Sequence, residues 1–156
     1  MAILPARFGT DLRLLRNLER QNDRNRGADL STLERPETHQ RDLETLNGAE
    51  NLQQALLLRF LTPTGELEQL GHPDYGSRLY TLIGELNNET TRNRAKLYVL
   101  EAVSAEPRVK QVRSVSVTQN RSDPTRVDIA MSLSVIDSDT PLNLVFPFFL
   151  ERGVTP

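Results

Sequence analysis

The ten residues RVDIAMSLSV, from Arg126 to Val135, carry the plainest structural pattern in the chain. Apolar and polar side chains alternate along them, so every second residue falls on the same face of an extended strand. The apolar face consists of Val127, Ile129, Met131, Leu133 and Val135. This alternation predicts a strand with one face in a hydrophobic core and the other turned away from it.

The stretch before this strand predicts its pairing partner. VRSVSVTQ, residues 112–119, shows a weaker alternation that places Val115 and Val117 on one face. The two stretches are separated by Asn120 to Pro124, a run of turn-forming residues. We therefore expect an antiparallel hairpin.

The stretch after the strand, LNLVFPFFL at residues 142–150, is apolar on both faces. Val145 and Phe149 fall on one face, and the other face is formed by Leu142, Leu144, Phe146 and Phe148. Pro147 has no N–H to donate, which confines the strand to an edge or an end of a sheet. An apolar edge strand is suited to pair with a strand of another chain. The alternative, that helices of the same chain cover it completely, stays open.

Three segments upstream have helical spacing. The first is NGAENLQQALLLRFL at residues 47–61, the second follows Ser77 as a possible cap, and the third follows the polar run NNETT and ends before Pro107. Their apolar positions are Leu52, Ala55, Leu56 and Phe60, then Leu79, Leu82, Ile83 and Leu86, then Ala95, Val99, Ala102 and Val103. The predicted fold is α+β, with three helices packed on a small, mainly antiparallel sheet with a C-terminal hairpin.

Residues 1–46 differ from the rest and predict a polar, arginine-rich N-terminal arm, followed by one domain over residues 47–156. Residues 1–26 hold six arginines and three acids, and this composition buries little apolar surface. Asp11 could cap a short helix carrying Leu12, Leu15 and Leu18. Either the arm is solvated or it orders against a partner. Its arginines lack interleaved aromatic residues, so we expect no nucleic-acid binding.

Composition and motifs give little support to catalysis. The chain has no cysteine, a net charge of −2 and two histidines, His39 and His72, without carboxylates at metal-ligand spacing. His72, Asp74 and Ser77 have the residue types of a nucleophilic triad but no strand–turn–helix frame around the serine. Glycosidase chemistry needs two carboxylates across a cleft, and the candidates are Glu66, Glu68, Glu101 and Glu106. We expect no catalytic residue, no metal and no cofactor.

No apolar run approaches the roughly 20 residues of a membrane span, and the N-terminus lacks a signal-peptide pattern. The expectation is a chain that is made and assembled in the cytoplasm, without membrane insertion.

The short stretch AEPRV, residues 105–109, lies where the helical period gives way to the strand period. A glutamate at the C-terminal end of a helix is electrostatically unfavourable, whereas an arginine there is favourable. Glu106 therefore needs a compensating partner, either within the chain or on another protein. A plain turn with an exposed ion pair is the simpler interpretation.

Taken in order, these elements resemble the baseplate wedge or sheath-initiator family of contractile tails, found in contractile phages, type VI secretion machines and extracellular contractile injection particles. The matching pieces are the apolar helix followed by LTPTGE, the HPDYGS turn with Tyr75, Gly76 and Ser77, and the triplet EPR at residues 106–108. The resemblance spans about residues 46–150.

The resemblance implies a small α+β domain that sits in six copies around the central tube of a baseplate. It implies that Glu106, Pro107 and Arg108 engage the larger wedge proteins, with Arg108 contacting a partner carboxylate. It also implies that the C-terminal strands accept strands of the contractile sheath protein, and the arm could reach tube or spike and hub proteins. Some members are labelled lysozyme, so peptidoglycan hydrolysis is kept as the alternative to a non-enzymatic structural role.

Overall fold

The computed structural model describes residues 8–14 and 30–151. The chain forms two compact units, Met1–Gln54 and Ala55–Pro156. They divide inside helix α1 (Gly48–Leu61), so the helix contributes its first half to one unit and its second half to the other.

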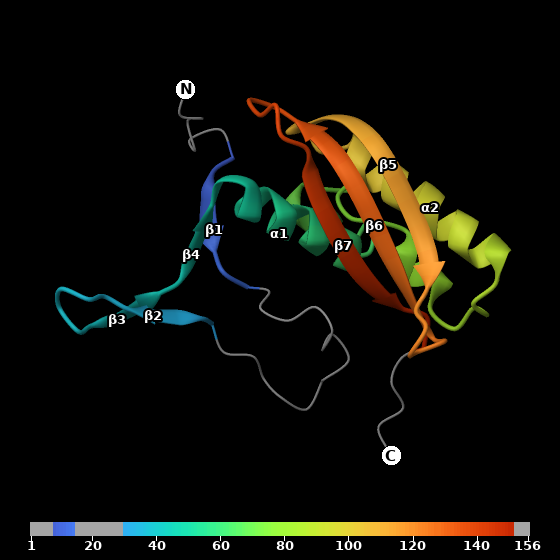
Figure 1. Cartoon of the computed structure of the whole chain (residues 1–156), viewed down its shortest axis with the longest axis horizontal. Helices are drawn as coiled ribbons and strands as arrows, with labels where there is room; N and C mark the ends of the chain where they lie inside the picture. Colours follow the sequence, from blue (N-terminus) through green and yellow to red (C-terminus); the bar gives the residue numbers. More distant parts are fainter. Residues whose placement is uncertain (1–7, 15–29, 152–156) are drawn as a thin grey trace, which may run out of the picture. The chain divides into compact units, whose positions relative to one another are not determined.

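The second unit is built on a three-stranded antiparallel sheet of β5 (Val109–Gln119), β6 (Arg126–Val135) and β7 (Leu142–Phe149). Their order in the sheet is β5-β6-β7, so β6 is central (Figure 1). The strand predicted from RVDIAMSLSV and the hairpin with the preceding stretch are both confirmed. β7 lies at an edge, as expected from Pro147.

The alternation along β6 becomes an alternation in burial. Every apolar residue predicted for its inner face is buried, and the residues between them are half-buried. β7 buries Leu142, Leu144, Phe146 and Phe148, whereas Val145 is 57% exposed. The period of the sequence therefore sets which face of the sheet forms the core.

Helix α2 (Glu89–Ser104) packs on β5 and covers one face of the sheet (Figure 1). Asn88 caps it, because its side-chain oxygen accepts a hydrogen bond from the Thr91 N–H at 2.8 Å. The helix ends before Pro107, as predicted. Its buried residues are Thr91, Ala95, Tyr98, Val99, Ala102 and Val103.

The helix predicted from residues 47–61 is confirmed as α1. In the second unit, its last turn carries Phe60, whose ring lies 5.5 Å from that of Phe146 in β7 and is tilted by 42°. This aromatic contact fastens the end of α1 to the inner face of the sheet.

The prediction of a third helix after Ser77 is wrong, because the described residues contain two α-helices. Residues Leu79–Leu82 form only one turn of 3-10 helix, η4. Leu79 and Leu82 are buried as expected, but Leu86 is 79% exposed. The reason lies at Ile83, which is extended, and at Gly84, whose φ of 96° is left-handed and cannot continue a right-handed helix.

The LTPTGE stretch at residues 61–66 and the HPDYGS turn at residues 72–77 meet beside the C-terminal end of α1. A short 3-10 helix, η3 (Glu68–Leu70), lies between them. The Ser77 N–H donates to the Thr62 carbonyl at 2.9 Å, and the Thr64 N–H donates to the Ser77 carbonyl at 3.1 Å. Gly76 permits this approach, since its φ is 114° and a Cβ there would overlap the Thr62 carbonyl oxygen.

The first unit contains two small antiparallel pairs. β1 (Thr10–Leu12) pairs with β4 (Thr45–Asn47), and β2 (Thr32–Glu34) pairs with β3 (Arg41–Leu43). The helix predicted from Asp11 is therefore wrong at residues 10–12, which are strand; its later positions, Leu15 and Leu18, lie outside the described residues.

Side chains from the first half of α1 explain why Leu12 is extended. The Gln54 side chain donates to the Leu12 carbonyl at 2.7 Å and accepts from the Leu14 N–H at 2.8 Å. The Asn51 side chain donates to the Phe8 carbonyl at 2.8 Å. These amides satisfy backbone groups that a helix would have used within itself, so a non-local contact overrides the local helical spacing.

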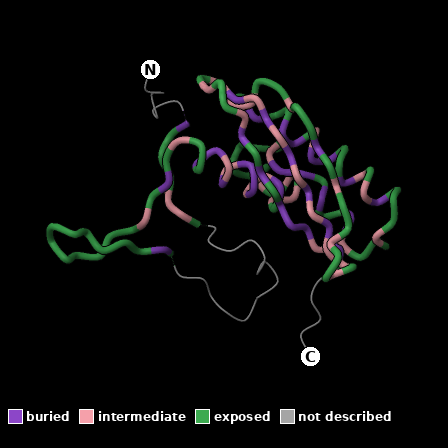
Figure 2. The backbone as a smooth tube through the Cα atoms, in the orientation of Figure 1, coloured by how far each residue is buried: buried purple, intermediate pink, exposed green. Residues whose placement is uncertain are grey.

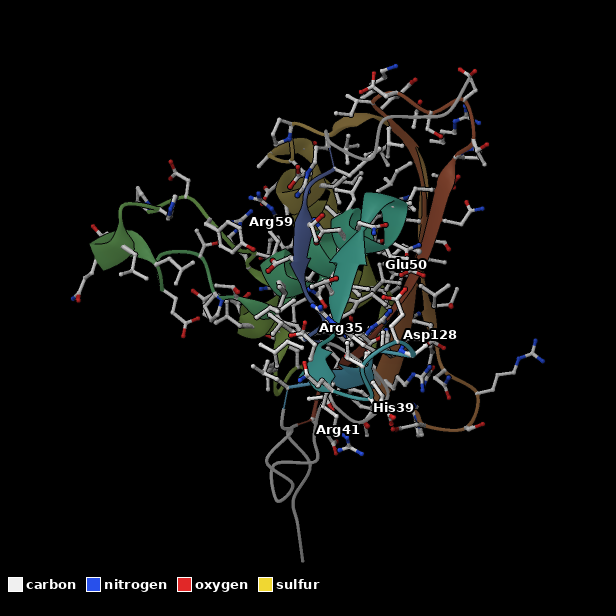
Figure 3. The ribbon with its side chains drawn as sticks, turned by 90° about the vertical axis from the view of Figure 1, so that its left-hand side faces the viewer. Arg35, His39, Arg41, Glu50, Arg59 and Asp128 are labelled. Atoms are coloured by element: carbon white, nitrogen blue, oxygen red, sulfur yellow. The ribbon has the colours of Figure 1, made fainter. Side chains whose placement is uncertain are left out.

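The β2–β3 hairpin is exposed along nearly its whole length (Figure 2). Arg35, His39 and Arg41 project from it (Figure 3). Arg35 pairs with Asp42, and the His39 Nδ1 lies 3.0 Å from a Glu34 carboxylate oxygen. The polar arm expected over residues 1–46 thus includes an ordered hairpin within its described part.

Replacing Gly76 with alanine should lower the free energy of unfolding by at least about 2 kcal/mol, because strain at a left-handed residue adds to a clash with backbone. Urea unfolding of purified protein measures the change. Gly71→Ala is the matched control, since Gly71 has a φ of 87° but nothing within 4 Å of its Cβ position. Equal losses for the two variants would show that close approach at Gly76 contributes nothing.

Candidate functional site

The EPR corner, defined as Glu106, Pro107 and Arg108, connects α2 to β5. The Glu106 N–H donates to the Val103 carbonyl at 3.0 Å, and the Glu106 carbonyl accepts from the Val109 N–H at 3.1 Å. Glu106 is 4% exposed, Arg108 is half-buried and Pro107 is exposed. The corner therefore turns its acid inward and its proline outward.

The Glu106 carboxylate is held by both neighbouring charges and backbone. Arg108 donates through Nε to Oε1 at 2.6 Å and through Nη2 to Oε2 at 3.1 Å, a two-point contact. The Arg108 backbone N–H also reaches Oε1 at 3.3 Å. The compensating partner that Glu106 was expected to need is thus found within the chain, two residues further on.

A second arginine comes from a distant part of the sequence. Arg59, in the last turn of α1 and labelled in Figure 3, places its Nη2 3.6 Å from Glu106 Oε2. Its guanidinium also lies 4.6 Å above the ring of Tyr75 in the HPDYGS turn. The end of α1, the HPDYGS turn and the EPR corner therefore meet at one cluster, which we call the Glu106 cluster: Arg59, Tyr75, Glu106 and Arg108.

Burial raises the pKa of Glu106, but the hydrogen bond and positive charge of Arg108, its backbone N–H and the charge of Arg59 outweigh burial and lower the pKa below its ordinary value. The side chain is accordingly a carboxylate at neutral pH. A buried carboxylate with two arginines is an electrostatic anchor between segments.

The sequence pointed to Glu106 as a residue in need of a partner but gave no indication of Arg59. The only local signal for Arg59 is its position as a basic residue in the last turn of a helix, where many helices carry one. The unfavourable position of Glu106 predicts that it needs a cation, and Arg108 supplies one; nothing in the sequence indicates that Arg59 is a second.

The structure places the predicted sheath-pairing residues in the core of the second unit. Val127, Ile129, Met131, Leu133 and Val135 are buried, as are the inner residues of β7. Moreover, β6 is paired on both sides, by β5 and by β7. A foreign strand would have to pair through backbone groups at a sheet edge. Of the two strands expected to accept a sheath strand, β6 and β7, only β7 lies at an edge.

The remaining candidates do not form a reactive arrangement. Within the described residues, no three His, Cys, Asp or Glu side chains gather as a metal site would require. Ser77 is buried, and its hydroxyl donates to the Phe60 carbonyl at 2.8 Å, which closes the turn behind α1. Residues 8–14 and 30–151 also contain no helix that is long and apolar enough to cross a bilayer.

Glu106→Gln should lower the free energy of unfolding at pH 7 by about 3 kcal/mol, because it leaves two largely buried guanidinium groups without their carboxylate. Glu101→Gln, which breaks the exposed pair with Arg78, is the control and should cost about 1 kcal/mol or less. Urea unfolding at pH 7 compares them; similar losses would contradict the anchoring role of Glu106.

The same residue should make stability depend on pH. Because its pKa is lower in the folded than in the unfolded chain, its stabilisation is complete above the ordinary value of 4.5 and is lost as the pH falls through the lower, folded value. Unfolding free energies measured from pH 7 to pH 3 should therefore fall more steeply below about pH 4.5 for the unchanged chain than for Glu106→Gln. Parallel curves would contradict this.

Comparison with known proteins places these features in a family. Residues 29–138 match the family model described as contractile injection system sheath initiator. A crystal structure described as a "putative tail lysozyme" from Geobacter sulfurreducens is similar, with 26% sequence identity and a TM-score of 0.57 over 67% of this chain and 93% of that one. A comparison with curated proteins gave no match. The family match covers the β2–β3 hairpin, the Glu106 cluster and most of the sheet. The chain therefore belongs to the contractile injection system sheath initiator family, structural components of tail-like contractile particles.

Proposed function

We propose that this chain is a baseplate subunit that joins the wedge to the contractile sheath and templates sheath assembly by strand pairing along β7. The observation that supports the proposal is the position of β7, which lies at one end of the strand order β5-β6-β7 and carries an exposed apolar side chain, Val145, in its middle. Its family membership supports an association with sheath and baseplate components.

The hydrogen-bond register of β7 indicates which of its backbone groups face outward. The Leu150 N–H donates to the Thr125 carbonyl, and this pair continues the β6–β7 register without a shift. In an antiparallel pair, hydrogen-bonded and non-bonded positions alternate. Leu144 and Phe146 therefore bond β6, and the backbone N–H and carbonyl of Val145 point to the second edge.

The exposed side chain of Val145 suits the same role. It is apolar and 57% exposed, in the middle of the edge strand. An incoming strand of the sheath protein would form main-chain hydrogen bonds with Val145 and cover its side chain. Pro147 lies two residues further on and limits how far a regular ladder can extend, because it has no N–H.

The wedge contact is proposed at the EPR corner. Arg108 was expected to bind a partner carboxylate, but in this chain it binds Glu106, so a partner would contact the outside of a corner that the Glu106 cluster holds rigid. Pro107 is the exposed residue of the three and is the one a wedge protein would meet first.

The rest of the proposed assembly rests on the resemblance to the family. Six copies would surround the tube in each baseplate, after assembly in the cytoplasm. The N-terminal arm would reach tube or spike and hub proteins, and its exposed hairpin, with Leu33 at 60% exposure, offers apolar surface for that contact. No cofactor, metal or nucleic acid enters this proposal.

Peptidoglycan hydrolysis is the second candidate, because the similar Geobacter protein is described as a tail lysozyme. Such chemistry uses a general acid whose pKa is raised. Glu106 is the buried carboxyl of the described residues, and its pKa is lowered, whereas Glu101 is bound to Arg78. These environments favour the non-enzymatic role.

Val145→Pro should prevent co-assembly with the sheath protein, because it removes an N–H from the outer edge of β7 without breaking a bond to β6. Val145→Thr keeps the N–H and the branched shape and is the matched control. Sedimentation of sheath co-expressed with each variant measures assembly, and circular dichroism checks folding. Normal sheath assembly with folded Val145→Pro would rule out pairing at this position.

Zymography on peptidoglycan separates the two candidates. We expect no clearing by the purified chain, and no difference on replacing Glu66 or Glu106 with glutamine. Clearing that is lost in either variant, with the fold intact, would establish the enzymatic role instead.

A further inference from the structure

A shallow pocket of about 190 Å³ lies between the HPDYGS turn and the C-terminal half of α2. Its walls include Asp74, Gly76 and Ser77 from the turn and Tyr98, Ala102 and Ala105 from the end of the helix region. Pockets for small-molecule ligands are generally about 300–1,000 Å³, so this one is of a size for a single side chain.

Of the two carboxylates that line the pocket, one is neutralised by an arginine and the other is not. Glu101 is neutralised by Arg78, which donates to it at 2.7, 2.8 and 3.1 Å and stacks over the Tyr98 ring at 4.3 Å. Asp74 lines the pocket, is exposed and, among the described residues, forms no ion pair or side-chain hydrogen bond. The pocket therefore carries one uncompensated negative charge.

Other residues that line the pocket are suited to contact an aliphatic chain. Ala102 and Ala105 present only methyl groups, and Gly76 presents bare backbone. A lysine or arginine can lay its methylene stem along such a surface and still place its charged end at Asp74. We propose that this pocket binds a basic side chain of a baseplate wedge protein; this rests on the wedge contact proposed above.

The Glu106 cluster explains how the pocket keeps its shape. Ala105 immediately precedes Glu106, and Tyr75, which lies between Asp74 and Gly76, stacks on Arg59. The two walls of the pocket are thus fastened to one another through the Glu106–Arg59 contact. On this assignment a wedge protein would contact Pro107 at the EPR corner and insert a basic side chain into the pocket beside it, while the Glu106 cluster holds both in place.

The pocket can be tested without a wedge protein. Titrating the full chain, labelled with nitrogen-15, with N-acetyl-arginine methylamide should shift the backbone amide signals of Gly76 and Ala105 in a saturable way. N-acetyl-norleucine methylamide has a similar aliphatic stem but no charge, and its affinity should be lower by at least about threefold. No saturable shifts, or equal binding of the two probes, would overturn the proposal.

Matched variants localise the charge. Asp74→Asn should weaken binding of the arginine probe by about threefold, whereas Glu89→Gln, at the far end of α2, should leave it unchanged. Equal effects of the two variants would mean that general electrostatic attraction, and not this pocket, accounts for the binding.

Co-purification with the wedge proteins of the same particle then separates this inference from the function on which it rests. Asp74→Lys and Ala105→Leu should reduce wedge recovery while circular dichroism shows an unchanged fold. Undiminished recovery with both variants would refute the pocket but leave the wedge role standing. Absence of wedge proteins even with the unchanged chain would overturn both.

Discussion

A carboxylate placed out of water at the C-terminal end of a helix is unfavourable twice, through lost hydration and through the helix dipole, and the second unit is organised around one such group. The burial of Glu106 is tolerated because Arg108, two residues further on, donates to its carboxylate and Arg59 contacts it from the end of α1. Arg108 balances the charge of Glu106, and the second contact, from Arg59, brings together two segments that are far apart in sequence. The corner is therefore also a tertiary contact.

The turn between those segments serves the same end. Gly76 lets the HPDYGS backbone approach the end of α1. The Ser77 hydroxyl and N–H then donate hydrogen bonds to carbonyls at that end, where a helix has no partners of its own. Tyr75 then covers the Arg59 guanidinium. Motifs that look separate in the sequence thus form one structure, whose outer surface contains the proline of the corner and a small acidic pocket.

The sheet contributes a second kind of surface. Its central strand is fully paired and its apolar residues fill the core, so neither its side chains nor its backbone can recognise another protein on the inner face. β7 differs because it lies at the end of the strand order and exposes an apolar side chain, Val145. The EPR corner precedes the first strand of the sheet, and β7 is the last strand. The wedge could therefore bind the corner while a strand of the sheath protein pairs with β7, which fits the structural role proposed for this member of the sheath initiator family.

The sequence by itself determined the features that depend on local periodicity and on proline. The two-residue period of Arg126–Val135, the helical face of residues 47–61 and the end of α2 before Pro107 all appear in the structure, because side-chain direction follows directly from backbone period. Pro147 likewise marked an edge strand, since no tertiary contact can supply its missing N–H.

Only the tertiary structure decided what depends on distant partners. Helical spacing after Ser77 was cut to one turn by the left-handed Gly84, and the spacing around Leu12 gave way to side-chain amides of α1. The sequence signalled that Glu106 needed a cation, which Arg108 supplies two residues away, but the second arginine, Arg59, is 47 positions away and reaches Glu106 only through packing. The pairing of each strand edge is also decided only in the assembled sheet. The period of the sequence determines which face of a strand each side chain occupies, but it does not determine which strands are neighbours.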